Sequence, residues 1–272
     1  MQCILSALKA ESDPLVNYFQ LKRHSSFQFP VFVHNDLYLI SIGVGKAKVQ
    51  ERIYSFLETI RDDFIQFINI GIAGGKNDNS ELGQMYLINK ILDGDTDHSY
   101  YPDILIRHSL AEHSVTTVNK GITDGGSRYK TLVDMEASEI FKICSKKIPV
   151  HRMAFLKIIS DYMDLDAVSF NAESISSLIT PNLKSINSFL NRFKTLQDLE
   201  QPILSKDDSD WINLIKDQLS LTESQYQQLI RATKGFRLRN PELHCPELQT
   251  EMPESKFNRN QIFKTLCDKL ST

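Results

Sequence analysis

Three acidic residues follow apolar stretches of this sequence and stand near a turn rich in glycine. Glu11 and Asp161 each come at the end of an apolar run, and Glu136 lies between two apolar residues. Residues 69–75 include three glycines, which let the backbone turn tightly or approach a ligand closely. In an open α/β sheet, ligands bind beyond the carboxyl ends of the strands. We therefore expect these carboxyl groups to act as acid and base on a ligand at one edge of a sheet.

Apolar runs and segments with helical spacing alternate along the first part of the chain. Strands are expected at residues 3–8, 37–44, 64–72, 85–92, 115–118 and 153–159. Helices are expected around residues 15–21, 49–60, 135–146 and 173–193, the last of them broken or kinked at Pro181. The first helix is expected to have its N-cap at Ser12 or Asp13, with Pro14 at its first position. Strands interleaved with helices predict an α/β fold.

The composition changes after about residue 197. Residues 197–272 contain one glycine, no convincing strand and several short helical patterns. Thr222 and Gln225 have the spacing of a capping box, and a last helix is expected near 261–270. We therefore divide the chain into an α/β domain, 1–196, and a helical extension of unknown role, 197–272.

One basic cluster with an aromatic residue lies in this extension. Its members are Arg231, Lys234, Arg237 and Arg239, around Phe236. Clusters of this type can bind nucleic acid. Because residues 197–272 hold ten basic and twelve acidic side chains, a charged helix face or a contact with a protein partner is the favoured interpretation.

The whole chain of 272 residues carries 31 lysines and arginines against 34 acidic residues, a formal charge of −3. This balance excludes a general binder of nucleic acid or anionic membranes. No two of the four cysteines have C-x-x-C spacing, and His244-Cys245 lacks further ligands, so neither a metal site nor a disulfide framework is expected. The first apolar run soon reaches Lys9 and Glu11, unlike a signal peptide or membrane span. A cytoplasmic protein is expected.

The order and types of these residues resemble the nucleoside phosphorylase/nucleosidase superfamily, and most closely the 5′-methylthioadenosine/S-adenosylhomocysteine nucleosidases. The resemblance covers about residues 1–196. Its most specific pieces are Ala73-Gly74-Gly75, Met135-Glu136-Ala137 and Ser160-Asp161. It implies a phosphorylase-like three-layer α/β/α core with a mixed central sheet, here followed by the helical extension. It also implies a homodimer that acts on a nucleoside without a metal or organic cofactor.

The resemblance assigns roles to individual residues. Cleavage of an N-glycosidic bond needs an acid that protonates the leaving base and a base that activates water. The catalytic residues would be Asp161, the acid, and Glu11, the base. Glu136 would bind the ribose hydroxyls. The remaining substrate-binding residues would be Ile72, Ala73 and Gly74 in the glycine turn, Met135 against the sugar, Ser160 beside the acid, and the aromatic Phe170.

Two departures from the family pattern bear on the reaction. Phosphorylases carry an arginine after the first strand and a hydroxyl residue in the glycine turn, where this chain has Val16 and Ile72. Hydrolysis of a purine-type nucleoside is therefore favoured over phosphorolysis. The aromatic that stacks on adenine in the nucleosidases has no counterpart in residues 117–124.

These departures leave alternatives open for the base, the reaction and the activity. Tyr100, Tyr101 or Tyr129 could stack on the base, or the base could differ, as in futalosine-type hydrolases. The protein could also be a phosphorylase. A further alternative is an inactive nucleoside-sensing module that contacts a protein partner through residues 197–272.

Overall fold

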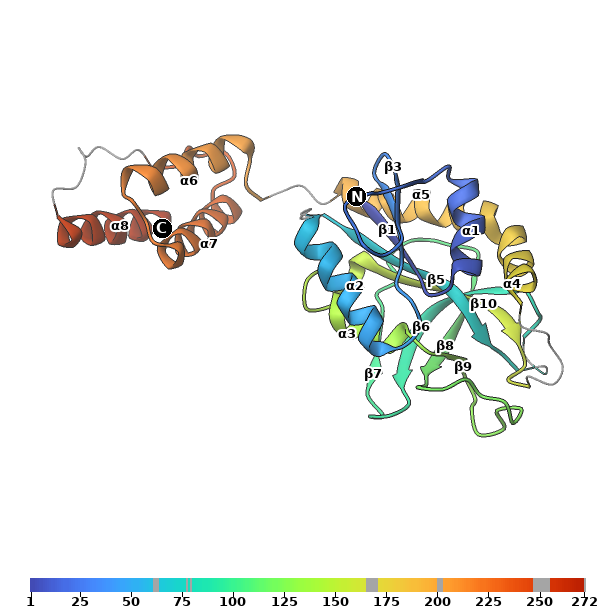
Figure 1. Ribbon diagram of the computed structural model, residues 1–272. Helices are drawn as coiled ribbons and strands as arrows, with labels where there is room; N and C mark the ends of the chain where they lie inside the picture. Colours follow the sequence, from blue (N-terminus) through green and yellow to red (C-terminus); the bar gives the residue numbers. More distant parts are fainter. Residues whose placement is uncertain are drawn as a thin grey trace. The chain divides into compact units, whose positions relative to one another are not determined.

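The computed structural model describes residues 1–60, 64–76, 78, 80–164, 171–199, 203–246 and 255–271 (Figure 1). The chain divides into two compact units, Met1–Asp198 and Leu199–Thr272. Each unit is considered by itself.

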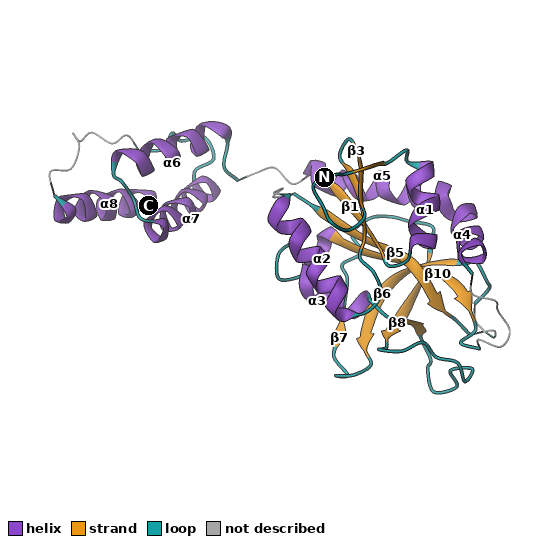
Figure 2. Cartoon of the chain, in the orientation of Figure 1, coloured by secondary structure: helices purple, strands orange, loops and turns teal. Residues whose placement is uncertain are grey.

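The first unit is built on a mixed sheet with helices on both faces (Figure 2). Its strands are β1 (Gln2–Ser6), β2 (Lys22–Arg23), β3 (Val31–His34), β4 (Leu37–Ser41), β5 (Gln66–Gly74), β6 (Met85–Asp93), β7 (Ser99–Tyr100), β8 (Ala111–Thr117), β9 (Leu132–Asp134) and β10 (Met153–Asp161). Its helices are α1 (Lys9–Tyr18), α2 (Lys46–Thr59), α3 (Ala137–Cys144), α4 (Ala172–Ile179) and α5 (Leu183–Leu199). A 3-10 turn at Thr180–Asn182 separates α4 from α5, where Pro181 was expected to interrupt the helix.

Five strands of the sheet close on one another. β5 pairs with β10, β10 with β6, β6 with β8, β8 with β9, and β9 again with β5. Strands β4 and β1 continue the sheet from β5, and both pairings along this extension are parallel. The carboxyl ends of β1, β4, β5 and β10 therefore meet at the same edge.

Neighbouring residues of the central strands face different helical layers. Cys3 and Phe155 belong to a core shared with α2 and α3, whereas Ile4 and Leu156 belong to a core shared with α1, α4 and α5. Because both faces of the sheet are covered, its strands are near-continuous apolar runs in the sequence. The expected three-layer α/β fold with a mixed sheet is confirmed.

The first helix begins earlier than the sequence predicts. Helix α1 begins at Lys9, with Leu8 as its N-cap, and Pro14 lies inside the helix. The prediction of an N-cap at Ser12 or Asp13 is therefore wrong.

A contact from another helix compensates for the proline inside α1. Pro14 has no N–H to donate to the carbonyl of Ala10, four residues earlier. The Ser176 hydroxyl of α4 donates to that carbonyl instead, at 2.8 Å. The early start of α1 also places Glu11 in the first turn, where its carboxylate accepts a hydrogen bond from the Leu8 N–H at 2.8 Å.

The second unit contains α6 (Lys206–Gln218), α7 (Glu223–Arg239) and α8 (Lys256–Ser271), which share an apolar core. Capping boxes at Ser205 and Thr222 begin α6 and α7, as the Thr222–Gln225 spacing predicts. The helical extension expected from the sequence is therefore present. None of the described helices of the chain is long and apolar enough to cross a membrane.

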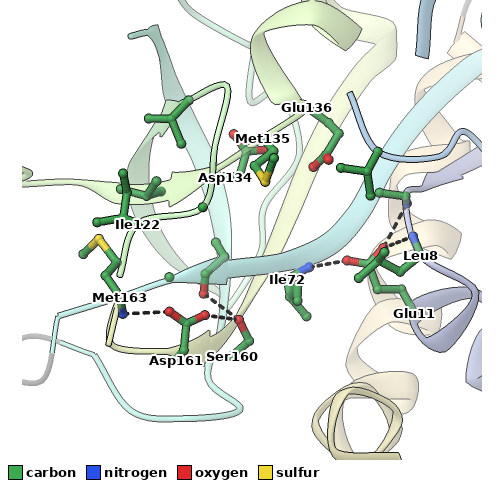
Figure 3. A pocket seen from close by; sticks show the side chains of 17 residues that line it. Leu8, Glu11, Ile72, Ile122, Asp134, Met135, Glu136, Ser160, Asp161 and Met163 are labelled. Carbon is green, nitrogen blue, oxygen red and sulfur yellow. Dashed lines mark hydrogen bonds between the residues drawn. The ribbon is translucent and has the colours of Figure 1, made fainter. Parts of the chain in front are cut away.

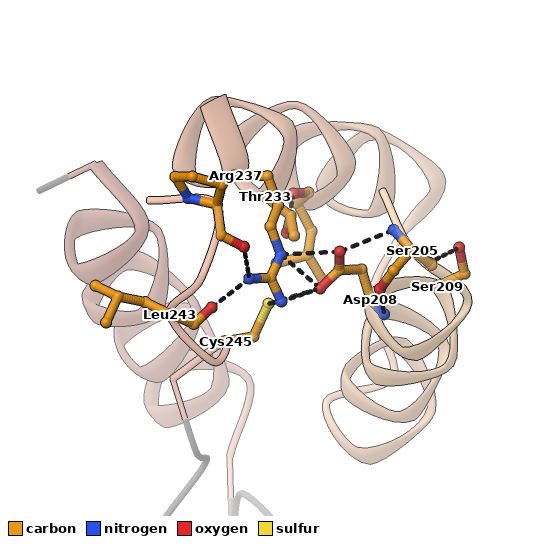
Figure 4. Close-up of polar contacts among 9 residues, drawn as sticks. Ser205, Asp208, Ser209, Thr233, Arg237, Leu243 and Cys245 are labelled. Atoms are coloured by element: carbon orange, nitrogen blue, oxygen red, sulfur yellow. Dashed lines mark hydrogen bonds and ion pairs between the residues drawn. The ribbon is translucent and has the colours of Figure 1, made fainter. Parts of the chain in front are cut away.

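A buried ion pair joins the start of α6 to the end of α7 (Figure 4). Nε of Arg237 donates to both carboxylate oxygens of Asp208 at 2.8 Å, and the Cys245 thiol donates to the same carboxylate at 3.4 Å. Arg237 also donates to the carbonyls of Pro241 and Leu243, which ties the segment after α7 to the ion pair.

Part of the basic cluster expected in this unit therefore makes contacts within the unit itself. Phe236 is buried in the helical core, Arg237 pairs with Asp208, and Arg239 donates to the Leu270 carbonyl at 2.6 Å. Arg231 and Lys234 are exposed.

Candidate active site

A pocket of about 300 Å³ lies at the edge where the parallel strands end (Figure 3). The residues predicted for the site that line this pocket are Glu11, Ile72, Ala73, Gly74, Met135, Glu136, Ser160 and Asp161. Phe170 lies outside the residues that the structure describes. The predicted residues thus come together from the ends of β1, β5, β9 and β10.

Glu11 is held firmly by backbone groups. Its side chain is buried, and one carboxylate oxygen accepts from the N–H groups of Ala7 and Leu8 at 2.9 and 2.8 Å and from the Ser6 hydroxyl at 3.1 Å. The other oxygen accepts from the Ile72 N–H at 2.8 Å. These donors satisfy the hydrogen-bonding capacity of a buried carboxylate and fix its orientation. Glu11 is thus a buried carboxylate that is fixed in the lining of the pocket.

Asp161 has a different set of partners. One of its oxygens lies 2.6 Å from the Ser160 hydroxyl, and the other accepts from the Met163 N–H at 2.7 Å. The Ser160 hydroxyl also reaches the Ala73 carbonyl, at 3.4 Å. Because a hydroxyl has a single hydrogen, Ser160 can donate to an ionised Asp161, or accept from a protonated Asp161 while it donates to Ala73. This pair can therefore hold Asp161 in place in either protonation state.

Glu136 is the third predicted acidic residue in the lining of the pocket. The pKa of Glu136 is raised to about 8: burial contributes most, the charges of Asp134 and Glu11 also raise it, and the charge of Lys157 opposes them. Figure 3 shows Asp161 and Ser160 at one end of the view, and Glu11 and Glu136 toward the other. A ligand in the pocket would therefore meet Asp161 at one end and two glutamates at the other.

A buried lysine that sequence reasoning did not single out stands behind this site. Lys157 is 1% exposed, and its ammonium is 2.7 Å from Asp134. Asp134 also accepts from the Thr117 hydroxyl at 2.6 Å and from the Ala137 N–H at 2.9 Å, at the start of α3. The signal in the sequence is a lysine inside the apolar run Met153–Asp161, where a charge needs a partner.

The glycines of the turn differ in what surrounds them. Of Gly71, Gly74 and Gly75, only Gly74 is among the described residues that line the pocket. A Cβ at Gly71 would lie 3.0 Å from Glu11 Oε1 and 3.6 Å from Lys157 Nζ. A Cβ at Gly75 would collide with the Ser80 hydroxyl. At these two positions glycine makes room for protein groups.

The wall beside Asp161 is apolar. Val118, Ile122 and Met163 line it, and Met163 is packed so closely that a Cβ at Gly74 would lie 2.7 Å from its Cγ. Tyr129 packs against the same cluster from outside the pocket lining.

The other two tyrosines considered for stacking lie elsewhere. Tyr100 stacks on Phe141 in the core, with 5.0 Å between ring centroids, and Tyr101 is largely exposed. Among the described residues, the wall beside Asp161 thus consists of aliphatic and thioether side chains and contains no aromatic ring.

The pocket is rich in carboxylates. Glu11, Asp134, Glu136 and Asp161 line it, and among the residues that the structure describes no lysine, arginine or histidine does. Such a lining disfavours an anionic ligand and favours a neutral or cationic one.

Comparison with known proteins places the fold. Neither protein-family models nor curated proteins match the sequence. Solved structures match it: a putative 5′-methylthioadenosine/S-adenosylhomocysteine nucleosidase from Francisella philomiragia has a TM-score of 0.56 at 18% identity, covering 70% of this chain and 98% of its own. A nucleosidase from S. pneumoniae with a transition-state inhibitor has a TM-score of 0.58 at 15% identity, covering 71% and 99%.

A third structure, of a variant nucleosidase (MTAN) from Chlamydia trachomatis, has a TM-score of 0.54 at 22% identity. It covers 69% of this chain and 97% of its own. The share of this chain that these structures cover agrees with the extent of the resemblance in the sequence and with the length of the first unit. The α/β part of this chain therefore has the fold of the 5′-methylthioadenosine/S-adenosylhomocysteine nucleosidases.

Proposed function

We propose that the protein hydrolyses the N-glycosidic bond of a purine-type nucleoside. The observation that carries this proposal is the arrangement of one pocket with a backbone-anchored glutamate, Glu11, on one side and the Ser160–Asp161 pair on the other. Homodimerisation and independence of metals and organic cofactors belong to the same proposal, on the strength of the family resemblance. A cytoplasmic location belongs to it on the strength of the cysteine pattern and the short first apolar run.

Each carboxyl group has one task in the proposed reaction. Glu11 accepts a proton from the water that attacks the anomeric carbon of the ribose. The glycosidic bond breaks, its electron pair goes to the base, and Asp161 donates a proton to a ring nitrogen of that base. Glu136 binds the ribose hydroxyls and, when ionised, stabilises the positive charge that develops on the sugar. The products are the free base and the free sugar.

The charge of the pocket supports water rather than phosphate as the acceptor. Phosphate binding in proteins relies on cationic side chains or clustered N–H donors. The N–H of Ile72, in the turn where phosphorylases have a hydroxyl residue, donates to Glu11 instead. The described lining of the pocket offers such an ion acidic side chains and no lysine, arginine or histidine.

The test is release of free base from a panel of nucleosides, with and without phosphate, in the presence of a chelator. We expect release without phosphate, and a loss of about a hundredfold or more in Glu11→Gln and in Asp161→Asn. Circular dichroism of both variants checks that they fold. Strict dependence on phosphate would replace this proposal with a phosphorylase.

The second candidate function is hydrolysis of a nucleoside with a different base. The aliphatic wall beside Asp161 favours it. Val118, Ile122 and Met163 offer shape but no aromatic face, which is worth about 1 kcal/mol to a stacked ring. The panel therefore includes nucleosides of hypoxanthine and of substituted purines, and 5′-substituted nucleosides of the futalosine type. Tight binding without release of any base would instead support the nucleoside-sensing alternative.

A further inference from the structure

One buried ammonium group faces three carboxylates beneath the pocket. Lys157 lies on β10 directly across from Gly71 on β5. Its Nζ is 2.7 Å from Asp134, and both Nζ and Glu11 Oε1 lie beside the position that a side chain at Gly71 would take. Glu136 follows Asp134 by two residues and is 92% buried. The cluster draws on α1, β5, β9 and β10 and has little access to solvent.

The charges of this cluster do not balance when every group is ionised. Glu11, Asp134 and Glu136 would carry three negative charges against the single positive charge of Lys157. Buried charges without partners are costly, so one carboxyl group is expected to retain its proton.

Hydrogen bonding shows which carboxyl group retains it. Glu11 accepts four hydrogen bonds from Ser6, Ala7, Leu8 and Ile72. Asp134 accepts from Thr117, Ala137 and Lys157. Both carboxylates thus have several donors each, whereas burial is the largest influence on Glu136 and favours its protonated form.

We propose that Lys157 is a positioning residue of this site, which is held by Asp134 and sets the charge of Glu136 before a nucleoside binds. This inference rests on the proposed function for its role in turnover, but not for the charge arrangement itself. In the empty site at neutral pH, Glu136 carries a proton and can both donate to and accept from a ribose diol. The charge of Lys157 lowers the free-energy cost of ionising Glu136, so that Glu136 can lose its proton when positive charge develops on the sugar.

The charged groups around Glu136 act in opposite directions. The pKa of Glu136 is raised to about 8, first by burial, then by the charge of Asp134 on β9 and less by that of Glu11 on α1. Lys157 on β10 lowers it. Burial alone would lower the pKa of Lys157, but the attraction of Asp134, Glu136 and Glu11 raises it above its usual value, so the ammonium stays charged.

Two substitutions therefore have opposite expected effects. Lys157→Met removes the cation and raises the titration midpoint of Glu136 by about one pH unit or more. Asp134→Asn removes a like charge, keeps the shape of the side chain, and lowers the midpoint by a similar amount. A general loosening of the site would move both midpoints in the same direction, toward the value of a solvated glutamate.

The experiment is a pH titration of the full-length protein labelled with ¹³C at glutamate side-chain carboxyls, followed by NMR. Glu136→Gln identifies the Glu136 signal, and Lys157→Arg is the conservative control, expected within about half a unit of the wild type because it keeps the charge. If Lys157→Met does not fold, Asp134→Asn still decides the direction. Midpoints that do not move, or that move together, would overturn the proposal.

The same variants separate this inference from the proposed function. Where the wild type releases base, kcat/KM should rise with pH through the Glu136 midpoint, and the rise should shift with each variant as the NMR midpoint does. A wild type that releases no base from any nucleoside contradicts the proposed function alone, since the NMR midpoints are measured without substrate.

Discussion

At Gly71 the absence of a side chain leaves room for two charged groups of the site. The Glu11 carboxylate and the Lys157 ammonium both lie beside the position that a Cβ would take, at 3.0 and 3.6 Å. The first distance is too short for ordinary van der Waals contact, so an added methyl group must displace Glu11. The strand backbone at this position has no left-handed φ angle, so the effect is one of space alone.

Gly71→Ala should therefore lower base release by about tenfold or more, because a small misplacement of a proton acceptor is costly to the rate. Gly121→Ala is the control: Gly121 lines the pocket itself, but a Cβ there meets nothing within 4 Å. Both variants are compared by kcat and KM on the best substrate of the panel. Equal activity of the two variants would contradict the role given to Gly71.

The residues of the site were predictable to different degrees. Glu11, Glu136 and Asp161 are carried by short motifs, and the structure brings all three to one pocket. Lys157 was missed because its partner, Asp134, is 23 residues away in the sequence, and their contact depends on the pairing of both β9 and β10 with β5. No local pattern encodes that arrangement.

At the scale of elements, the long buried strands were the most predictable. The pattern for residues 64–72 gives β5 (Gln66–Gly74), and that for 85–92 gives β6 (Met85–Asp93), each within two residues at either end. Short strands such as β7 and β9 are set by pairing with a neighbour and have no periodicity of their own. The start of α1 was misread because Pro14 inside a helix depends on a donor, Ser176, from a distant helix.

In the second unit, the Asp208–Arg237 pair fixes one element to the next. Asp208 is 1% exposed, so removal of its partner leaves a buried charge unpaired. Arg237→Met should lower the free energy of unfolding of this unit by about 3 kcal/mol. Arg231→Met, an exposed position on the same helix, should change it by less than about 0.5 kcal/mol. Urea unfolding followed by fluorescence of Trp211, the single tryptophan, reports on this unit.

The same pair gives the second unit an expected acid response. Burial alone would raise the pKa of Asp208, but the hydrogen bonds of Arg237 and Ser205 lower it to about 2. Its stabilising effect is therefore complete above the pKa of the unfolded chain, near 4, and is lost as the pH falls through 2. Between these limits the Trp211 transition should move to lower urea in the wild type, and much less in Arg237→Met, where the ion pair is already absent.

At the scale of the whole molecule, the pocket and the extension belong to different compact units. Each described residue that lines the pocket lies before residue 164, and the last helix of the first unit, α5, is anchored by its own contacts. The Gln197 side chain donates to the Met1 carbonyl at 2.8 Å and to the Phe64 carbonyl. The second unit has a separate apolar core built from α6, α7 and α8.

A chain that ends at Leu199 should therefore fold and release base with kcat and KM within about twofold of the full-length protein, since the cores of the two units are distinct. The measurement compares both chains on the same substrate, with their far-UV circular dichroism as the check of folding. A chain that ends at Asn191 is the matched control: it loses Phe193 from the core and Gln197 from its contacts with Met1 and Phe64, and should unfold at lower temperature. If the Leu199 chain folds but loses activity, the extension contributes to the reaction, and its role is catalytic or regulatory rather than that of a separate module.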